Sequence, residues 1–369
     1  MSLNCGIVGL PNVGKSTLFQ AITSAPAEAA NYPFCTIEPN VGIVNVGDKR
    51  LLDIAAIVKP EKVLPAAVEF VDIAGLVKGA SKGEGLGNQF LGHIRQVNAI
   101  IHVVRCFEDA DVIHVEGRID PIEDIETINL ELALADLEVV EKRLGNLAKL
   151  LKSNNKEVVK NAKISQPALE KLKMFLSEGT VARKVDLSAE DLLSISDLNL
   201  ITLKPILYLC NIDEESLTEK NENVEKVKKY AEMDGAQTLC ICGKLESEIA
   251  SLESQEEKLE FMEAAGIADS GLTFLTKVAY DMLGLRTYFT AGVKEVRAWT
   301  FPEGAKAPQA AGVIHTDFEK GFIKAEVYHY DDLMRFGSET KVKEAGKFRI
   351  EGKEYLVKDG DIVHFRFNV

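Results

Sequence analysis

The pattern of hydrophobic and polar residues changes twice along this 369-residue chain. Up to about residue 120, short apolar runs alternate with loops and helical segments. The runs at 68–73 and 99–104 are mostly apolar, which is typical of strands in the core of a parallel sheet. Similar runs return at 205–211 and 238–242. These runs predict an α/β domain.

A helical section interrupts this domain over residues 123–197. A returning helix rich in lysine is expected near 167–176, with the polar stretch 152–156 as the turn before it. Apolar residues recur at spacings of three and four, which predicts an amphipathic αα-hairpin or short coiled coil. They are Leu130, Leu134, Leu137, Val140, Leu144, Leu147 and Leu151.

The pattern changes again after Leu283. Short strands are predicted at 293–301, 323–327 and 362–367, separated by turns rich in Gly, Pro and Asp. We therefore expect an α/β domain over 1–283, interrupted by the helical insertion, and a small β-rich domain over 284–369.

The first loop of the chain carries the strongest chemical signal. Residues 9–16 read Gly-Leu-Pro-Asn-Val-Gly-Lys-Ser, between a predicted strand at 3–8 and a predicted helix at 15–23. A strand, a glycine loop and a helix start together aim backbone N–H groups at an anion. In such a phosphate loop, Lys15 reaches the β- and γ-phosphates and the Ser16 hydroxyl ligates Mg²⁺.

Two later segments complete the expected triphosphate site. Asp72 closes a buried strand and is followed two residues later by Ala74 and then Gly75, so that the carboxylate can hold the Mg²⁺ shell and the glycine N–H can meet the γ-phosphate. Thr36 lies in the loop between these motifs and offers a second hydroxyl to the metal. The predicted Mg²⁺ ligands are Ser16, Thr36 and Asp72.

The base-reading motif departs from the guanine pattern. Guanine-reading proteins end a strand in Asn-Lys-x-Asp, whereas this chain has Asn211-Ile212-Asp213-Glu214. The longer glutamate misplaces the bidentate carboxylate, and a hydrogen-bonding site discriminates sharply when its match is lost. The sequence therefore predicts adenine preference, with Cys242-Gly243-Lys244 as the second base loop.

Composition and charge limit the class of protein. The six cysteines form no Cys-x-x-Cys pair, and neither a signal peptide nor a membrane span is recognisable, so we expect a cytoplasmic protein with reduced thiols. The formal net charge of −14 argues against a generally basic nucleic-acid binder. Residues 141–184 nevertheless carry eleven bases against four acids. This stretch is either a solvated helix surface or a basic arm for a polyanionic partner.

Taken together, the motifs resemble the YchF branch of the Obg-related P-loop NTPases, the Obg-like ATPases. The resemblance covers essentially the whole chain. It is carried by residues 9–17, 31–40, 72–87, 107–117, 211–214, 310–322 and 359–361.

This resemblance implies a G domain with a helical-hairpin insertion and a C-terminal TGS domain of ubiquitin-like β-grasp type. It implies hydrolysis of ATP in preference to GTP, and association with the ribosome. We expect the contact at the large subunit or at ribosomal RNA, and we expect a monomer. The nucleotide-binding residues that it implies are Asn12, Val13, Gly14, Lys15, Ser16, Thr17, Gly75, Asn211, Ile212 and Glu214.

The catalytic groups differ from those of Ras-like enzymes, in which a glutamine after the Asp-x-x-Gly orders the water. Leu76 stands in that place. The resemblance offers His114 as the water-positioning group and Asn12 as a ligand of K⁺ beside the phosphates, with Lys15 as the phosphate-binding cation. A conventional translation GTPase and a non-catalytic, nucleotide-regulated RNA- or ribosome-binding module remain alternative functions.

Overall fold

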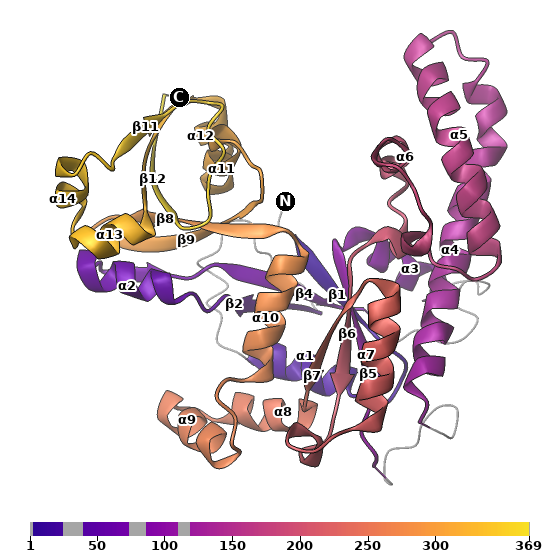
Figure 1. Cartoon of the computed structure of the whole chain (residues 1–369), viewed down its shortest axis with the longest axis horizontal. Helices are drawn as coiled ribbons and strands as arrows, with labels where there is room; N and C mark the ends of the chain where they lie inside the picture. Colours follow the sequence, from indigo (N-terminus) through magenta and orange to yellow (C-terminus); the bar gives the residue numbers. More distant parts are fainter. Residues whose placement is uncertain (1–2, 25–39, 74–85, 110–118, 369) are drawn as a thin grey trace. The chain divides into compact units, whose positions relative to one another are not determined.

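The computed structural model describes residues 3–24, 40–73, 86–109 and 119–368. The chain divides into two compact units (Figure 1). The first comprises residues 1–24 and 70–271, and the second comprises 25–69 and 272–369. Among the described residues, no helix has the length and apolar character needed to cross a membrane.

The first unit is built on a parallel sheet. Strands β1 (Asn4–Val8), β5 (Ala99–Arg105), β6 (Ile206–Asn211) and β7 (Gln237–Ile241) lie side by side in that order, all parallel. The end of β4 (Ala67–Asp72) neighbours β1. Every residue of β5 and β6 is buried, as expected for central parallel strands. The predicted α/β fold is confirmed.

Helices complete the first unit. The helix α1 (Lys15–Ser24) packs against α8 (Gly243–Ser251), and α7 (Glu222–Asp234) packs on β7. The first unit also contains α3 (Leu86–Gln96) and α9 (Gln255–Ala264).

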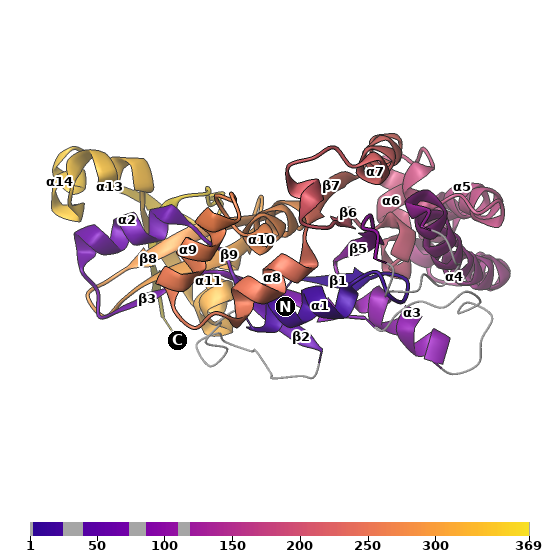
Figure 2. The same ribbon diagram turned by 90° about the horizontal axis from the view of Figure 1, so that it is seen from below.

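The predicted helical hairpin is present. It consists of α4 (Pro121–Leu150) and α5 (Lys156–Ser177), which lie side by side in Figures 1 and 2. Asp120 caps α4 by accepting hydrogen bonds from the backbone N–H groups of Ile122 and Glu123, and Pro121 takes the first helical position. Asn155 caps α5 in the same way.

The predicted apolar stripe is buried against α5 only in the outer part of the hairpin, which is the part next to the turn between α4 and α5. Val140 and Leu147 are buried against leucines of α5, whereas the side chain at the start of the predicted stripe, Leu130, is 45% exposed. The lower part of α4 packs on β5 and α7, and there Ile125 and Leu132 are buried instead. The buried face rotates because the helix changes its packing partner along its length.

Short elements connect the hairpin to the next strand of the sheet. After α5 the chain continues through η2 (Ala182–Lys184), α6 (Ala189–Ser194), η3 (Ser196–Leu198) and η4 (Ile201–Leu203) before β6. Asp136 of α4 holds this return: its buried carboxylate accepts hydrogen bonds from the backbone N–H groups of Ile201 and Thr202 and from the Thr202 hydroxyl.

The second unit contains a mixed sheet. Its strands are β8 (Leu285–Ala291), β9 (Glu295–Pro302), β10 (Phe322–His329), β11 (Arg349–Glu351), β12 (Asp361–Phe367) and β3 (Lys62–Leu64), in the order β11-β10-β12-β8-β9-β3. The first and last strands of the C-terminal part, β8 and β12, are parallel neighbours. The strands predicted at 293–301, 323–327 and 362–367 correspond to β9, β10 and β12.

Small helices cover a core formed by Tyr288, Phe301, Val327 and Val363. These helices are α11 (Ala307–Ile314) and α12 (Thr316–Lys320), while α13 (Tyr330–Phe336) and α14 (Glu339–Glu344) follow β10. The unit also holds α2 (Lys49–Val58), β2 (Val41–Asn45) beside β4, and nearly all of α10 (Gly271–Met282).

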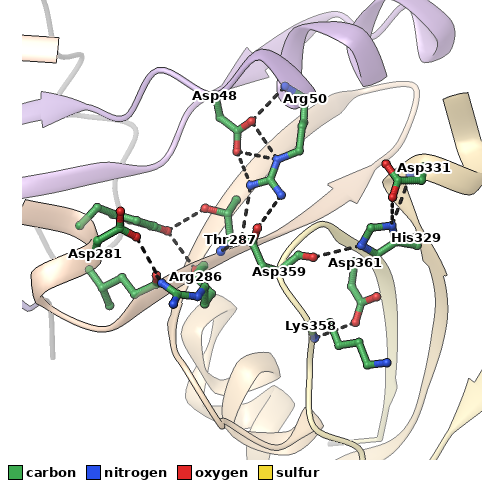
Figure 3. A network of polar contacts seen from close by, with 12 residues as sticks. Asp48, Arg50, Asp281, Arg286, Thr287, His329, Asp331, Lys358, Asp359 and Asp361 are labelled. Carbon is green, nitrogen blue, oxygen red and sulfur yellow. Dashed lines mark hydrogen bonds and ion pairs between the residues drawn. The ribbon is translucent and has the colours of Figure 1, made fainter. Parts of the chain in front are cut away.

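An arginine joins the early segment to the C-terminal part within the second unit (Figure 3). The Arg50 guanidinium lies between two carboxylates, with Nη2 2.7 Å from Asp48 Oδ2 and Nη1 2.6 Å from Asp359 Oδ2. Asp359 also accepts a 2.9 Å hydrogen bond from the Thr287 N–H at Oδ1. Together with the pairing of β3 with β9, these bonds make residues 40–69 part of the C-terminal unit. The domain limits 1–283, 123–197 and 284–369 remain predictions, and the compact units divide the chain differently.

A buried polar cluster ties the hairpin to the sheet of the first unit. Asp234 Oδ2 lies 2.6 Å from Arg183 Nη2 and 2.6 Å from the Tyr208 hydroxyl, and its other oxygen lies 3.2 Å from Lys184 Nζ. Asn129 of α4 contacts Arg183 and Tyr208. Burial alone would raise the pKa of Asp234, but the hydrogen bond and charge of Arg183, followed by Tyr208 and Lys184, lower it.

We expect Asp234→Asn to lower the free energy of unfolding by about 3 kcal/mol at neutral pH, because the largely buried Arg183 loses its charged partner. A depressed pKa stabilises the fold above the ordinary value of 3.8, and this contribution is lost as pH falls through the folded pKa. The gap between wild type and variant should therefore stay constant down to about pH 5 and shrink below about pH 4.

Urea unfolding at several pH values measures this gap. Asp269→Asn, at an exposed position of the same unit, is the matched control and should unfold like wild type. Equal stability of Asp234→Asn and wild type at pH 7 would show that the cluster does not hold the hairpin.

Candidate functional site

The phosphate loop has a backbone that only particular residues adopt easily. Between β1 and α1, Asn12 and Gly14 have φ values of 64° and 89°. A Cβ atom on Gly14 would lie 2.1 Å from Nδ2 of Asn211, so this position excludes any side chain. The loop then enters α1, where the Leu18 N–H donates to the Gly14 carbonyl at 3.1 Å. The predicted strand, loop and helix therefore form the expected anion-binding turn.

Lys15 and Asp72 meet at the end of the sheet. The Lys15 ammonium forms an ion pair with Oδ1 of Asp72, the last residue of β4, and only 10% and 20% of the two side chains are exposed. The structure thus brings together the predicted phosphate-binding cation and a predicted metal ligand. Ser16 and Thr17 follow with exposed side chains on the first turn of α1.

Asn211 connects the phosphate loop to the second base loop. Its Nδ2 donates to the Val13 carbonyl at 2.9 Å, and its Oδ1 accepts from the Gly243 N–H at 2.9 Å. The side chain is buried at the end of β6. The sequence predicts a contact of Asn211 with the base, and the structure adds a task that the sequence did not reveal, since the amide joins two loops.

Ile212 and Glu214 lie at the other end of the site. Ile212 is buried, and its N–H donates to the Ile241 carbonyl at 2.9 Å, so only its carbonyl is left for a ligand. Glu214 is exposed, and its Oε1 lies 2.9 Å from Nζ of Lys244 on α8. The end of the site at which the sequence predicts the base therefore presents a paired carboxylate rather than a free one.

These parts line one cavity of the first unit, of about 1080 Å³. This volume suits a ligand of nucleotide size. Its walls come from the phosphate loop, the residues after β5, the residues after β6 and the start of α8: Leu10, Pro11, Asn12, Gly14, Lys15, Ser16, Thr17, Phe107, Glu108, Asp109, Asn211, Ile212, Asp213, Glu214, Cys242, Gly243, Lys244, Ser247, Glu248 and Ser251.

Phe107, Glu108 and Asp109, directly after β5, line the cavity but were not among the predicted site residues, although the resemblance included the segment 107–117. Arg105 is buried, its guanidinium lies 4.5 Å from the ring centre of Phe107, and it donates to the carbonyls of Phe107 and Asp109 at 3.3 Å. The start of this loop is thereby held against the cavity. The position of the loop directly after a core strand was the available signal, because ligands bind at the carboxyl ends of parallel strands.

Three predicted site residues lie outside the described part of the chain: Thr36, Gly75 and His114. Their roles stay predictions. Within the described residues, no cluster of three or more His, Cys, Asp or Glu side chains is placed to hold a metal. Mg²⁺ bound with a nucleotide needs no such cluster, because phosphates and waters supply most of its ligands. The Asp72 carboxylate and the Ser16 hydroxyl, beside Lys15, are a donor set that fits this ion.

Models of known protein families match both ends of the chain. Residues 4–142 match the family model described as "50S ribosome-binding GTPase". Residues 285–368 match the model of the YchF GTPase C-terminal region, described as "Protein of unknown function".

Similar proteins extend over the full length. The "Ribosome-binding ATPase YchF" of Bacillus subtilis is 57% identical over 371 residues, and that of Escherichia coli O157:H7 is 53% identical over 369 residues; both alignments cover 100% of each chain. The solved structure of the Schizosaccharomyces pombe YchF GTPase is 43% identical, has a TM-score of 0.88, and matches 99% of this chain and 98% of its own. The chain therefore belongs to the YchF family of P-loop NTPases.

Proposed function

We propose that this protein is a ribosome-binding ATPase that binds ATP, and GTP more weakly, and hydrolyses the β–γ phosphoanhydride bond. The observation that carries this proposal is the cavity itself, which has an anion-binding loop with Lys15 at one end and the paired Glu214 at the other. The names of the relatives, "Ribosome-binding ATPase YchF", support the same activity. We further propose that the protein acts as a cytoplasmic monomer.

Lys15 has a second task when nucleotide binds. We propose that its ammonium then turns from Asp72 to the β- and γ-phosphates, which leaves the Asp72 carboxylate for the shell of Mg²⁺. Ser16 and Thr36 would supply hydroxyl ligands, and the Gly75 N–H would meet the γ-phosphate. The bound ion would neutralise charge on the β- and γ-oxygens, while the residues of the loop hold the phosphates in line for attack.

For hydrolysis we propose that His114 orients the attacking water. The water oxygen bonds to the γ-phosphorus and gives a proton to the neutral His114 imidazole, the bond between that phosphorus and the bridging oxygen breaks, and ADP leaves with the electron pair. Leu76 cannot order water by hydrogen bonding, so another group is needed. Asn12, exposed within the phosphate loop, would hold K⁺ beside the phosphates, and the charge of that ion would assist the leaving oxygen.

Two variants separate binding from chemistry. Lys15→Ala should lose tight ATP binding, because a charge-assisted contact to the phosphates disappears. His114→Ala should keep the ATP dissociation constant within about twofold and lower turnover at least tenfold, because it acts only on water. Calorimetry measures ATP binding, and phosphate release measures turnover.

Equal losses of binding and turnover in His114→Ala would contradict its water-positioning role. Tight ATP binding with no phosphate release by wild type would favour a non-catalytic module.

The base preference has its own test. Replacing Ile212 with Lys and Glu214 with Asp restores the guanine pattern, so the double variant should bind GTP more tightly relative to ATP by at least about tenfold. Titration with both nucleotides measures the ratio. If the unmodified protein binds GTP tenfold more tightly than ATP, it is a conventional GTPase and the proposed ATP preference is wrong.

The hairpin is the proposed contact with the ribosome, at its large subunit or ribosomal RNA. Five lysines of the outer part of the hairpin are exposed: Lys149, Lys152, Lys156, Lys160 and Lys163. The section 141–184 carries a net charge of +7 on a chain of −14. Such an array suits the phosphates of RNA without reading its bases, and its binding should depend strongly on salt.

Reversing three of these charges tests the contact. Changing Lys152, Lys156 and Lys160 to Glu should weaken ribosome co-sedimentation at least about tenfold at low salt, and less as salt rises. The matched control changes Lys220, Lys226 and Lys229 to Glu, since these lysines are also exposed and lie on or next to α7. The control should bind like wild type. Unchanged binding of the arm variant at both salt concentrations would show that the lysines are only a solvated surface.

A further inference from the structure

Lys244 is placed to act on the base end of the cavity. It is the second residue of α8, and its Nζ lies 2.9 Å from Oε1 of Glu214. Both residues line the cavity, and 73% of the Lys244 side chain and 52% of the Glu214 side chain are exposed. An exposed ion pair of this kind adds little to the stability of the fold. Its importance lies in the hydrogen-bonding groups that it offers to a ligand in the cavity.

Hydrogen bonds fix the two loops that carry Lys244 and Glu214 relative to each other. The Gly243 N–H, next to Lys244, donates to Oδ1 of Asn211, and the Ile212 N–H donates to the Ile241 carbonyl. The ends of β6 and β7, from which both loops start, are neighbours in the parallel sheet. Hydrogen bonds made by the backbone of both loops therefore fix the positions from which Lys244 and Glu214 reach each other.

Lys244 also faces a second acid. Glu248 lies one turn later on α8 and lines the same cavity. The hydrogen bond to Glu214 raises the pKa of Lys244, with smaller contributions from the charges of Glu214 and Glu248. The side chain is therefore an ammonium with N–H donors and no acceptor.

The hydrogen-bonding pattern of this pair differs from that of a free carboxylate. A free carboxylate offers two acceptor oxygens, which match the N1–H and N2–H donors of guanine. The Lys244–Glu214 pair offers one donor, the ammonium, and one acceptor, the remaining carboxylate oxygen. Adenine presents the complementary pattern, with N1 as an acceptor and its 6-amino group as a donor. Guanine carries the reverse pattern at the same two positions, so that in the same orientation its N1–H donor would meet the ammonium and its O6 acceptor would meet the carboxylate.

We propose that Lys244 is a specificity-determining residue, which converts the Glu214 carboxylate from a guanine acceptor into half of a donor–acceptor pair for adenine. This inference rests on the proposed ATP binding at the cavity. The altered Asn211–Glu214 motif only weakens guanine binding. The Lys244–Glu214 pair would add hydrogen bonds that favour adenine and contacts that oppose guanine.

The test is the ratio of dissociation constants for non-hydrolysable analogues of GTP and ATP with Mg²⁺, measured by calorimetry on the full chain. In Lys244→Met the carboxylate is released, and the GTP/ATP ratio of dissociation constants should fall at least about tenfold. Lys244→Arg keeps a cationic donor and should keep most of the wild-type ratio.

Lys228→Met is the matched control. Lys228 forms an exposed pair of similar length with Glu225, 3.0 Å apart on α7, and does not line the cavity. This variant should keep the wild-type ratio. A ratio in Lys244→Met within about twofold of wild type would overturn the inference, as would an equal fall in the control.

Failure of the inference and failure of the proposed function look different. If wild type shows no preference for the ATP analogue, the proposed ATP specificity falls. If wild type prefers the ATP analogue and Lys244→Met does so to the same degree, the function stands and Lys244 has no part in base selection.

A double variant strengthens the test: Glu214→Gln with Lys244→Met places a donor and an acceptor on one amide, and its GTP/ATP ratio of dissociation constants should return toward that of wild type.

Discussion

The nucleotide cavity depends on the two hydrogen bonds of the Asn211 side chain. They join the Val13 carbonyl of the phosphate loop to the Gly243 N–H of the second base loop, 2.9 Å on each side. Gly14 has no side chain, which leaves room for this amide. Because the amide is buried, loss of either partner would leave a polar group unsatisfied in the core. The phosphate end and the base end are therefore held at a fixed separation.

Buried polar groups also decide how the helical hairpin is attached. Its lower part could not be held by leucine packing alone, since α4 there contacts the sheet instead of α5. Asp234 with Arg183, and Asp136 with the backbone of Ile201 and Thr202, give directional contacts at this base. Hydrogen-bonded charges in low dielectric are costly when a partner is missing, so they favour a single orientation. A defined orientation would suit the proposed contact of the exposed hairpin lysines with the ribosome.

The second unit is assembled from segments that lie far apart in the sequence. Residues 40–69 lie far from the C-terminal strands in the sequence, yet β3 extends the C-terminal sheet and Arg50 pairs with Asp359. Parallel pairing of β3 with β9 satisfies the edge of that sheet with a distant segment.

The sequence by itself determined what depends on neighbours along the chain. The alternation of core strands, the amphipathic hairpin, the glycine turn before Lys15 and the missing guanine motif are all local patterns, and the structure has the predicted strands and helices. The tertiary structure decided the contacts between distant residues: Asn211 with Val13, β3 with β9, and Glu214 with Lys244. The physical reason is that helical period, capping and turn geometry act over a few residues, whereas the partner of a buried amide or an edge strand is chosen by the folded whole.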